Sequence, residues 1–266
     1  MTWLRVSKAR PCLICHKSDW CTYTEELSCC MRVQSERPAG NGGWFHGGAG
    51  TRASAPVARR ALDGYEGPDF NAQRWWETVR TVCRVDKLTP WAEALGLPME
   101  ALDWMGACTL GPMLTFPMYD GTGAICGIRT RNPDGAKRAV TGSRAGVFLP
   151  TVHMPEHEAM VCEGPTDSAA AVALGFEPIG RPSCAGCERH VVDTCRRLGR
   201  RRVTICADGD GPGIAGAKRL ADVLRAARLS VRLVTPGGHK DLRDWWRGGA
   251  TREHVDAAWS QAEWRG

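Results

Sequence analysis

The two stretches that decide the fold are Met160-Val161-Cys162-Glu163-Gly164-Pro165-Thr166-Asp167 and Val203-Thr204-Ile205-Cys206-Ala207-Asp208-Gly209-Asp210-Gly211. Each begins with a short apolar run, which is typical of a buried parallel strand, and each ends in carboxylates and glycine where a helix begins. Ligands bind at the carboxyl ends of the strands in an open α/β sheet. We therefore expect the two acidic turns to face a common crevice.

The carboxylates of Glu163, Asp208 and Asp210 would meet in this crevice. Crowded carboxylates repel one another unless a divalent cation neutralises them, and an all-oxygen ligand set suits Mg²⁺ or Mn²⁺. A metal ion held by carboxylates is a common apparatus for phosphoryl transfer. The sequence therefore predicts that these three residues are catalytic and bind the metal ion, with a general base as the alternative role of Glu163.

The two turns resemble the Toprim domain, the metal-binding fold shared by DnaG-type primases, topoisomerases and some nucleases. The resemblance rests on the Glu-Gly-x-x-Asp turn at 163–167 and on the Asp-x-Asp turn at 208–210, which is followed by glycine and a helix predicted at 215–227. It implies an α/β fold over residues 156–266, with a parallel sheet covered by helices on both faces and a C-terminal helical extension.

Two further carboxylates belong to this resemblance. Asp241 follows Lys240 just past the last predicted strand, a position that resembles the late acidic site of primases and makes Asp241 a fourth candidate Mg²⁺ contact. The alternative is an N-cap for the helix predicted at 242–247. Asp167 is expected to support the site, either by orienting a ligand or by capping the helix that follows it.

Residues 1–46 carry a second candidate metal site. Five of the 13 cysteines fall between Cys12 and Cys30, and a segment this short cannot build a hydrophobic core, so thiolates on Zn²⁺ would replace one. Cys29 and Cys30 compete for the last ligand position because adjacent strand residues point to opposite faces. The predicted zinc ligands are Cys12, Cys15, Cys21 and Cys30.

The choice of Cys30 rests on a second resemblance. Cys-x-Arg followed by Gly-Gly-Trp-x-His (Cys30, Arg32, and 42–46) is similar to the zinc ribbons that precede phage and plasmid primase cores. This module would contact the template, with Arg32, Trp20 and Trp44 as candidates for phosphate contact or base stacking. A small aromatic core is the other interpretation of the tryptophans, and the one we prefer. His16 and His46 remain possible replacement zinc ligands.

Between the two candidate sites, residues 47–60 lack hydrophobic periodicity and predict a flexible linker. Residues 61–155 predict a small subdomain of helices and β-strands, with strands at 113–119 and 124–131, that resembles the N-terminal part of the primase polymerase core. In the resembling primases, basic residues of this part hold the template and the nucleotide phosphates. An ordinary solvated strand face is the alternative. The candidate phosphate-binding residues here are Arg129, Arg131 and Lys137.

Composition sets wider bounds. The chain has 266 residues and a net charge of +6, which is compatible with nucleic acid without requiring it. No apolar run approaches the length of a membrane span, and no signal-peptide core begins the chain, so we expect a cytoplasmic protein without membrane contact. In that compartment the scattered cysteines are expected to stay reduced.

The resemblance implies a DNA primase-like nucleotidyltransferase that makes short primers on single-stranded DNA from nucleoside triphosphates. A Toprim-type nuclease that activates water, and a non-catalytic DNA-binding accessory protein of replication, are the alternatives. Residues 211–216 fit the dinucleotide-binding G-x-G-x-x-G fingerprint, but Asp208 and Asp210 would repel a pyrophosphate there. No P-loop is present, so any replicative helicase would be a separate partner.

Overall fold

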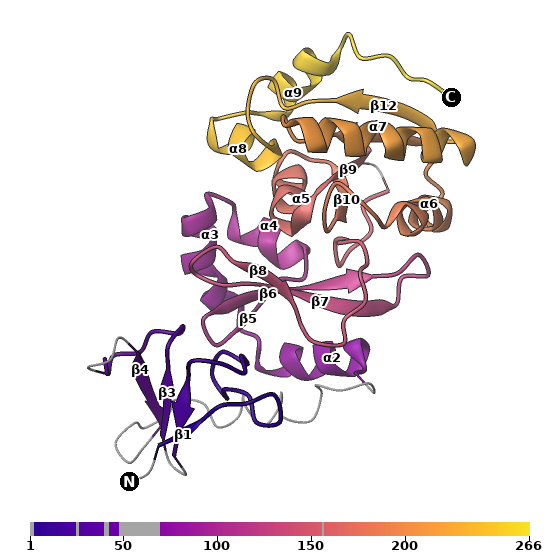
Figure 1. Ribbon diagram of the computed structural model, residues 1–266. Helices are drawn as coiled ribbons and strands as arrows, with labels where there is room; N and C mark the ends of the chain where they lie inside the picture. The colour runs from indigo at the N-terminus through magenta and orange to yellow at the C-terminus, as the bar shows by residue number, and fades with distance from the viewer. Residues whose placement is uncertain (1–2, 25–26, 40–42, 48–69, 156) are drawn as a thin grey trace. The chain divides into compact units, whose positions relative to one another are not determined.

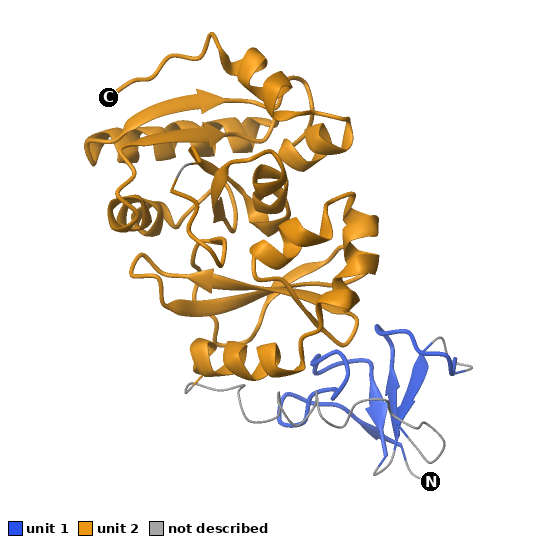
Figure 2. Ribbon diagram, turned by 180° about the vertical axis from the view of Figure 1, so that it is seen from behind, with its two compact units in different colours: residues 1–56 blue, residues 57–266 orange. Residues whose placement is uncertain are grey.

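A computed structural model describes residues 3–24, 27–39, 43–47, 70–155 and 157–266 (Figure 1). The chain divides into two compact units, Met1–Pro56 and Val57–Gly266 (Figure 2). Residues 48–60 of the predicted linker lie outside the described residues. No helix in the described ranges is both long enough and apolar enough to cross a bilayer.

The first unit is built on a small antiparallel sheet whose strands follow one another in chain order, β1-β2-β3-β4. Its buried cluster joins Val6 to three cysteines, so a large part of the core is made of thiols. So small a sheet needs a staple to be stable. The strands are β1 (Leu4–Arg5), β2 (Thr22–Tyr23), β3 (Leu27–Cys30) and β4 (Trp44–Gly47).

The second unit begins with short helices that pack on an antiparallel sheet of order β5-β6-β7-β8. The Asn71 side chain accepts a hydrogen bond from the Arg74 N–H at 2.9 Å and starts the first helix, whose apolar face packs against Ile128 of the sheet. The helices are α2 (Ala72–Val82), the 3₁₀ turn η1 (Val85–Leu88), α3 (Thr89–Leu95) and α4 (Met99–Trp104). The strands are β5 (Cys108–Leu110), β6 (Met113–Tyr119), β7 (Ile125–Arg131) and β8 (Lys137–Ala139).

The rest of the second unit is a sheet whose strands are parallel, as the sequence predicts, and the structure shows their order to be β10-β9-β11-β12. Its strands are β9 (Ala159–Glu163), β10 (Glu177–Arg181), β11 (Arg202–Cys206) and β12 (Ser230–Val234). Its helices are α5 (Gly164–Ala173), α6 (Glu188–Arg197), α7 (Gly211–Ala226), α8 (Leu242–Arg247) and α9 (Arg252–Trp259).

Helices cover both faces of this sheet because its strands are apolar on both sides. Helices α5, α8 and α9 share one buried cluster with Met160, and helices α6 and α7 share another with Val161, the next residue of the same strand. The most deeply buried residues of α5 are small, Ser168 and Ala169 to Ala171, which lets the helix lie between the sheet and its neighbouring helices. The prediction of an α/β fold with a doubly covered parallel sheet is confirmed.

Candidate functional site

The carboxyl ends of the parallel strands deliver the predicted acidic residues to one edge. Glu163 is the last residue of β9, and Asp208 comes two residues after β11, the strand that lies beside β9 in the sheet. Gly164 follows Glu163 with φ of +74°, a conformation that favours glycine and lets the chain turn directly into α5. We use the name acidic edge for Glu163, Asp167, Asp208, Asp210 and Asp241.

The turn after β11 and the loop after β12 are held together by the backbone. The Gly209 N–H donates to the Lys240 carbonyl at 2.8 Å. A Cβ on Gly209 would stand 2.9 Å from the His239 carbonyl oxygen, so only glycine allows this approach. The contact brings the Asp-x-Asp turn and the Lys-Asp pair of the sequence to the same place.

Two of the acidic side chains cap helices. An Asp210 carboxylate oxygen accepts from the Gly213 N–H at 2.7 Å and caps α7, while Asp241 accepts from the Asp244 N–H at 2.7 Å and caps α8. Asp210 therefore occupies the helix N-terminus that a dinucleotide pyrophosphate would need, which argues against the dinucleotide-binding interpretation. Among the described residues, each of these caps uses one carboxylate oxygen, Oδ1.

Asp167 has a different structural role from the one that its sequence position suggests. It lies in the first turn of α5, but its carboxylate accepts from the Arg243 N–H of α8 at 3.0 Å, with the side chain buried. Asp167 thus fixes the start of the helix that Asp241 caps. The expectation that it caps its own helix is replaced by a cap on a helix that comes much later in the chain.

Burial and mutual repulsion disfavour the ionised forms of the carboxylates at the acidic edge. Burial, and then the Glu163, Asp241 and Asp210 carboxylates, raise the pKa of Asp208 to about 7. Burial and Asp241 also raise the pKa of Asp167 to about 7. Burial raises the pKa of Glu163, which Arg181 on the neighbouring strand and Lys137 oppose. Ionised carboxylates at this edge therefore favour a bound cation.

Basic residues of β7 and β8 face this edge. The positive charge of Lys137 acts on both Glu163 and Asp208, and burial together with nearby Arg131 lowers its own pKa. Burial and the Arg243 guanidinium lower the pKa of Arg131. The cations of one sheet thus lie opposite the carboxylates of the other, in an arrangement suited to a phosphate-metal complex.

Arg129 has a partner within the protein: its Nη2 donates to the Pro182 carbonyl at 2.9 Å and ties β7 to the loop after β10. Sequence reasoning missed two other arginines, Arg181 and Arg243. Arg181 is 2% exposed and its guanidinium donates to Glu188 at 3.0 Å and to the backbone of the same loop. Its place at the carboxyl end of β10 is the signal that could have identified it.

The chemistry of the acidic edge fits Mg²⁺ bound together with a substrate. In the described part of the chain, no three acidic side chains come close enough to share one ion. The four-cysteine cluster is the one group of possible metal ligands there that lies close enough together. Mg²⁺ does not require such a cage, because it is commonly held by one or two carboxylates, water and substrate phosphates. Glu163 and Asp208 cap no helix through their side chains and are the first candidates to hold it.

In the first unit, the four predicted cysteines form a closed cluster. The sulfurs of Cys12, Cys15, Cys21 and Cys30 all lie within 4.8 Å of one another. Cys30, not Cys29, is the fourth member, so the structure decides between the two alternatives. The His46 ring instead hydrogen-bonds the Val33 carbonyl at 3.0 Å. Four converging thiols suit tetrahedral Zn²⁺, and the N–H groups of residues 31–33 point at two of the sulfurs.

The thiols of the cluster cannot all ionise without a cation. Burial opposes ionisation of Cys15, but the Lys17 N–H and the neighbouring thiols outweigh it and lower its pKa to about 7. Burial, together with Cys15 and Cys12, raises the pKa of Cys21 to about 12. The first thiolate to form thus keeps its neighbours protonated, and bound Zn²⁺ would remove that restraint.

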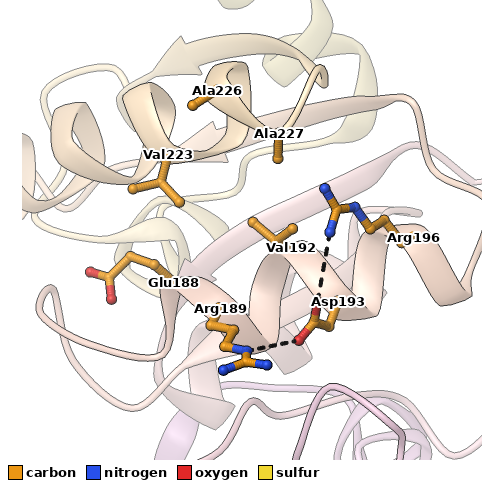
Figure 3. A pocket seen from close by; sticks show the side chains of 8 residues that line it. All are labelled: Glu188, Arg189, Val192, Asp193, Arg196, Val223, Ala226 and Ala227. Carbon is orange, nitrogen blue, oxygen red and sulfur yellow. Dashed lines mark ion pairs between the residues drawn. The ribbon is translucent and has the colours of Figure 1, made fainter.

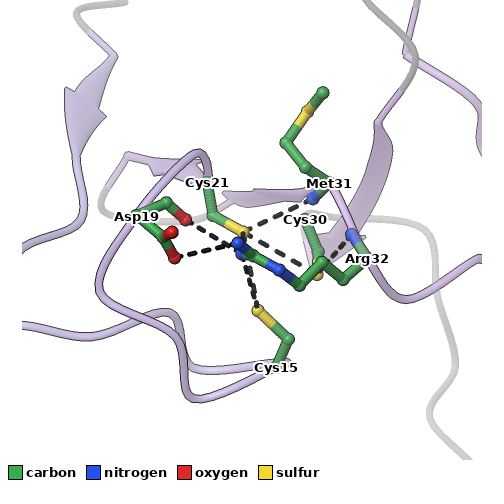
Figure 4. A network of polar contacts seen from close by, with 6 residues as sticks. All are labelled: Cys15, Asp19, Cys21, Cys30, Met31 and Arg32. Atoms are coloured by element: carbon green, nitrogen blue, oxygen red, sulfur yellow. Dashed lines mark hydrogen bonds and ion pairs between the residues drawn. The ribbon is translucent and has the colours of Figure 1, made fainter.

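Arg32 lies beside this cluster (Figure 4). Its guanidinium pairs with Asp19 at 2.9 Å and contacts the Cys15 and Cys21 sulfurs at 3.9 Å. The Trp20 ring is 5.8 Å from the Arg32 guanidinium carbon, and the Trp20 residue is 77% exposed. The preference for a core role is therefore wrong for Trp20, which is a surface aromatic next to a cation.

Comparison with known families and structures supports this architecture. Residues 160–245, which include every member of the acidic edge, match the Toprim-like family model. No curated protein matches the chain in sequence.

Among solved structures, the chain is similar to DnaG-type primase cores. A DnaG primase catalytic domain bound to single-stranded DNA is 15% identical, with a TM-score of 0.56 over 78% of this chain and 80% of that one. The Escherichia coli primase catalytic core is 15% identical, with a TM-score of 0.53 over 73% and 79%. The zinc-binding and RNA polymerase domains of the Aquifex aeolicus primase are 13% identical, with a TM-score of 0.56 over 75% and 62%. At these identities the likeness establishes the fold.

Proposed function

We propose that this protein is a DNA primase-like nucleotidyltransferase that joins nucleoside triphosphates into short primers on single-stranded DNA. The observation that carries the proposal is the acidic edge facing the cations of β7 and β8 inside a primase-like fold. The single-stranded DNA bound to one structural relative supports the choice of template. A nuclease would use the same carboxylates, but the cations opposite them favour a triphosphate substrate.

In this mechanism Glu163 and Asp208 would hold Mg²⁺, and Asp210 and Asp241 would supply further carboxylate oxygens to it. The bound ion would supply charge neutralisation on the triphosphate and a lower pKa for the attacking 3′-hydroxyl. Lys137 and Arg131 bind the triphosphate oxygens and orient the α-phosphate. The hydrogen bond from Arg129 to the Pro182 carbonyl makes Arg129 a positioning residue for the loop beside Glu163.

Zn²⁺ in the four-cysteine cluster would hold the first unit in its fold, and Arg32 would orient the thiolates through its contacts with Cys15 and Cys21. The exposed Trp20 ring offers a stacking surface for a template base. Any replicative helicase would act with this chain as a separate partner.

The test is incorporation of labelled nucleoside triphosphates on single-stranded DNA with Mg²⁺. Asp208→Asn should lower synthesis by at least about 10³-fold because it removes a metal ligand while keeping the side chain's shape. Asp222→Asn is the matched control: this aspartate is exposed on α7, where it pairs with Arg225. Metal-dependent cutting of the template without synthesis would instead assign a nuclease. DNA binding with neither reaction would assign an accessory protein.

A further inference from the structure

A pocket lies at the amino end of the parallel sheet, at the opposite end of β10 from the acidic edge. Its volume is about 220 Å³, and its walls come from the end of β6, residues 149–153, the start of β10 and the end of α6. Glu177 begins β10, and Arg181, the strand neighbour of Glu163, ends it, so about 13 Å of strand separates the pocket from the acidic edge. The proposed reaction uses none of the residues that line this pocket.

Hydrogen bonds hold the walls of the pocket in place. Glu177 is 1% exposed, and its carboxylate accepts from the Met154 N–H at 2.9 Å and from Nε of Arg200 at 2.9 Å. The same guanidinium donates to the Met154 carbonyl at 2.8 Å. Further along the wall, the Thr151 N–H donates to the Trp104 carbonyl at 2.7 Å. The pocket is therefore formed before a ligand arrives, as is usual for small-molecule sites.

The buried glutamate also orients the ring of His153. Nδ1 of His153 lies 2.5 Å from Oε1 of Glu177, and because a carboxylate accepts hydrogen bonds, Nδ1 carries the proton. The other ring nitrogen, Nε2, is then an acceptor in the neutral ring. No described residue hydrogen-bonds Nε2, and the side chain is 44% exposed. His153 thus offers an acceptor that an N–H or O–H of a ligand would satisfy.

Arg197 supplies the unpaired cation of the pocket. Figure 3 shows two other arginines of α6, Arg189 and Arg196, which both pair with Asp193. Within the described ranges, Arg197 forms no ion pair and no side-chain hydrogen bond. Its guanidinium lies against Gly123, where a Cβ would come 3.2 Å from the central guanidinium carbon. Arg197 is exposed, so its charge is accessible to an anion.

The charges around the pocket leave a net positive one. Glu177 is the acidic residue of the lining, and its ion pair with Arg200 cancels its charge inside the protein. Arg197 then remains, and His153 adds a second positive charge only when it is protonated. An anionic ligand therefore meets a free cation and no free carboxylate of the lining.

The other walls are apolar. Leu149, Pro150 and Leu198 line the pocket together with Tyr119. Aliphatic and aromatic walls accept a flat ring. The volume is below the roughly 300–1,000 Å³ of sites for drug-sized molecules, which limits the ligand to about one nucleotide. A flat heterocycle that carries an amino group and a single phosphate has the chemistry of a nucleoside monophosphate.

We propose that this pocket binds a nucleoside monophosphate, whose base donates an N–H to Nε2 of His153 and whose phosphate pairs with Arg197. The base packs against Leu149 and Tyr119. The ligand joins β6 to α6 and to the start of β10, so binding raises the melting temperature of the second unit. The pocket is separate from the acidic edge, and the proposal does not depend on which reaction that edge performs.

The probe is AMP, titrated into the full chain by isothermal titration calorimetry in buffer without divalent cations. Adenosine lacks the phosphate and inorganic phosphate lacks the base. We expect AMP to bind at least about ten times more tightly than either, because each lacks one of the two polar contacts. Inorganic phosphate that binds as tightly as AMP would reveal a simple anion site and overturn the proposal. Absence of AMP binding at about 10 mM would overturn it as well.

Variants locate the binding. Arg197→Gln should weaken AMP by about tenfold or more, and so should His153→Asn, which keeps a donor for Glu177 but removes Nε2. Arg196→Gln is the matched control, since Arg196 is the next residue of α6 and lies outside this pocket. Circular dichroism checks that each variant is folded. Arg197→Gln, at an exposed position, decides if His153→Asn is not folded.

A further variant separates the pocket from the acidic edge. Lys137→Gln removes a cation that faces that edge and should leave AMP binding unchanged. If Lys137→Gln abolished AMP binding while Arg197→Gln preserved it, the nucleotide would lie at the acidic edge and the proposal would be wrong. An equal loss with Arg196→Gln and Arg197→Gln would show a general charge effect, which would overturn it too.

Discussion

The four-cysteine cluster and the acidic edge are both candidate metal sites, but the protein assembles only one of them completely. The sulfurs of the cluster all lie within 4.8 Å of one another in a unit with little other core. The carboxylates of the acidic edge stand on separate turns of a well-packed sheet, and two of them are occupied in capping helices. A fold that depends on its metal must bring all the ligands together, whereas a fold that acts on a substrate can leave positions for that substrate.

Breaking the closed site should have the largest effect. Cys30→Ser removes one of four thiolates from a site whose bound Zn²⁺ is worth about 10–16 kcal/mol in comparable small modules. We expect the first unit to lose its zinc and unfold, while the second unit keeps its melting transition. Zinc content by atomic absorption and far-ultraviolet circular dichroism are the measurements.

Cys29→Ala is the matched control for this prediction. Cys29 is buried next to Cys30 in β3 but lies outside the cluster. The Cys29→Ala variant should be somewhat less stable than the wild type and still bind one zinc ion per chain. Equal zinc loss in both variants would mean that the neighbouring thiols exchange as ligands, and the comparison between closed and open sites would fail.

Removal of free metal ions by buffer exchange should distinguish the two sites. Gel filtration without metal ions should leave zinc bound at one ion per chain and remove Mg²⁺, because the open site lacks the ligands to retain it without substrate. We expect nucleotide incorporation to fall by about 100-fold or more and to return when Mg²⁺ alone is added. If activity returned only with zinc, the ion needed for catalysis would be Zn²⁺ and the assignment of Mg²⁺ to the acidic edge would be wrong.

The sequence predicts those helices and strands well whose signals lie in neighbouring residues. The strand at 113–119 and the helix at 242–247 have the predicted bounds, because neighbouring residues carry the signals of alternation, turns and caps. Strands β1, β4 and β5 were not predicted, since elements of two to four residues depend on partners elsewhere in the chain.

Contacts between distant segments account for what the sequence does not reveal about the site. The Asp167 cap on α8 joins residues 76 positions apart, and no local pattern predicts it. Arg181 and Arg243 are single arginines in a chain with many, and only the fold shows that they lie beside the carboxylates. The exposure of Trp20 likewise depends on how the small unit packs.

The long-range cap gives a prediction of intermediate size. Asp167→Ala leaves the Arg243 N–H at the start of α8 without its acceptor, which should lower the free energy of unfolding by about 1–2 kcal/mol. Asp167→Asn keeps an acceptor oxygen in the same place and should cost less than half of that. Thermal denaturation of the two variants measures the difference, and equal losses would show that charge, not the cap, is what Asp167 contributes.

The smallest expected effect concerns the electrostatic cost of the open site without its ion. Because burial and neighbouring carboxylates raise the pKa of Asp208 to about 7, its contribution to stability is present below the ordinary carboxyl pKa and is lost as the pH rises through 7. Asp208→Asn should therefore stabilise the metal-free protein at pH 8 by about 1 kcal/mol after solvent screening, or about 2–4 °C in melting temperature. The same substitution should have almost no effect at pH 4.

Added Mg²⁺ should shrink the gain in stability of Asp208→Asn at pH 8, since only the wild-type site binds the ion fully. Asp222→Asn, on the exposed side of α7, should show none of this pH dependence. If Asp208→Asn lowers the melting temperature at pH 8 without metal, the carboxylates of the acidic edge do not repel one another, and the open site would be as self-sufficient as the closed one.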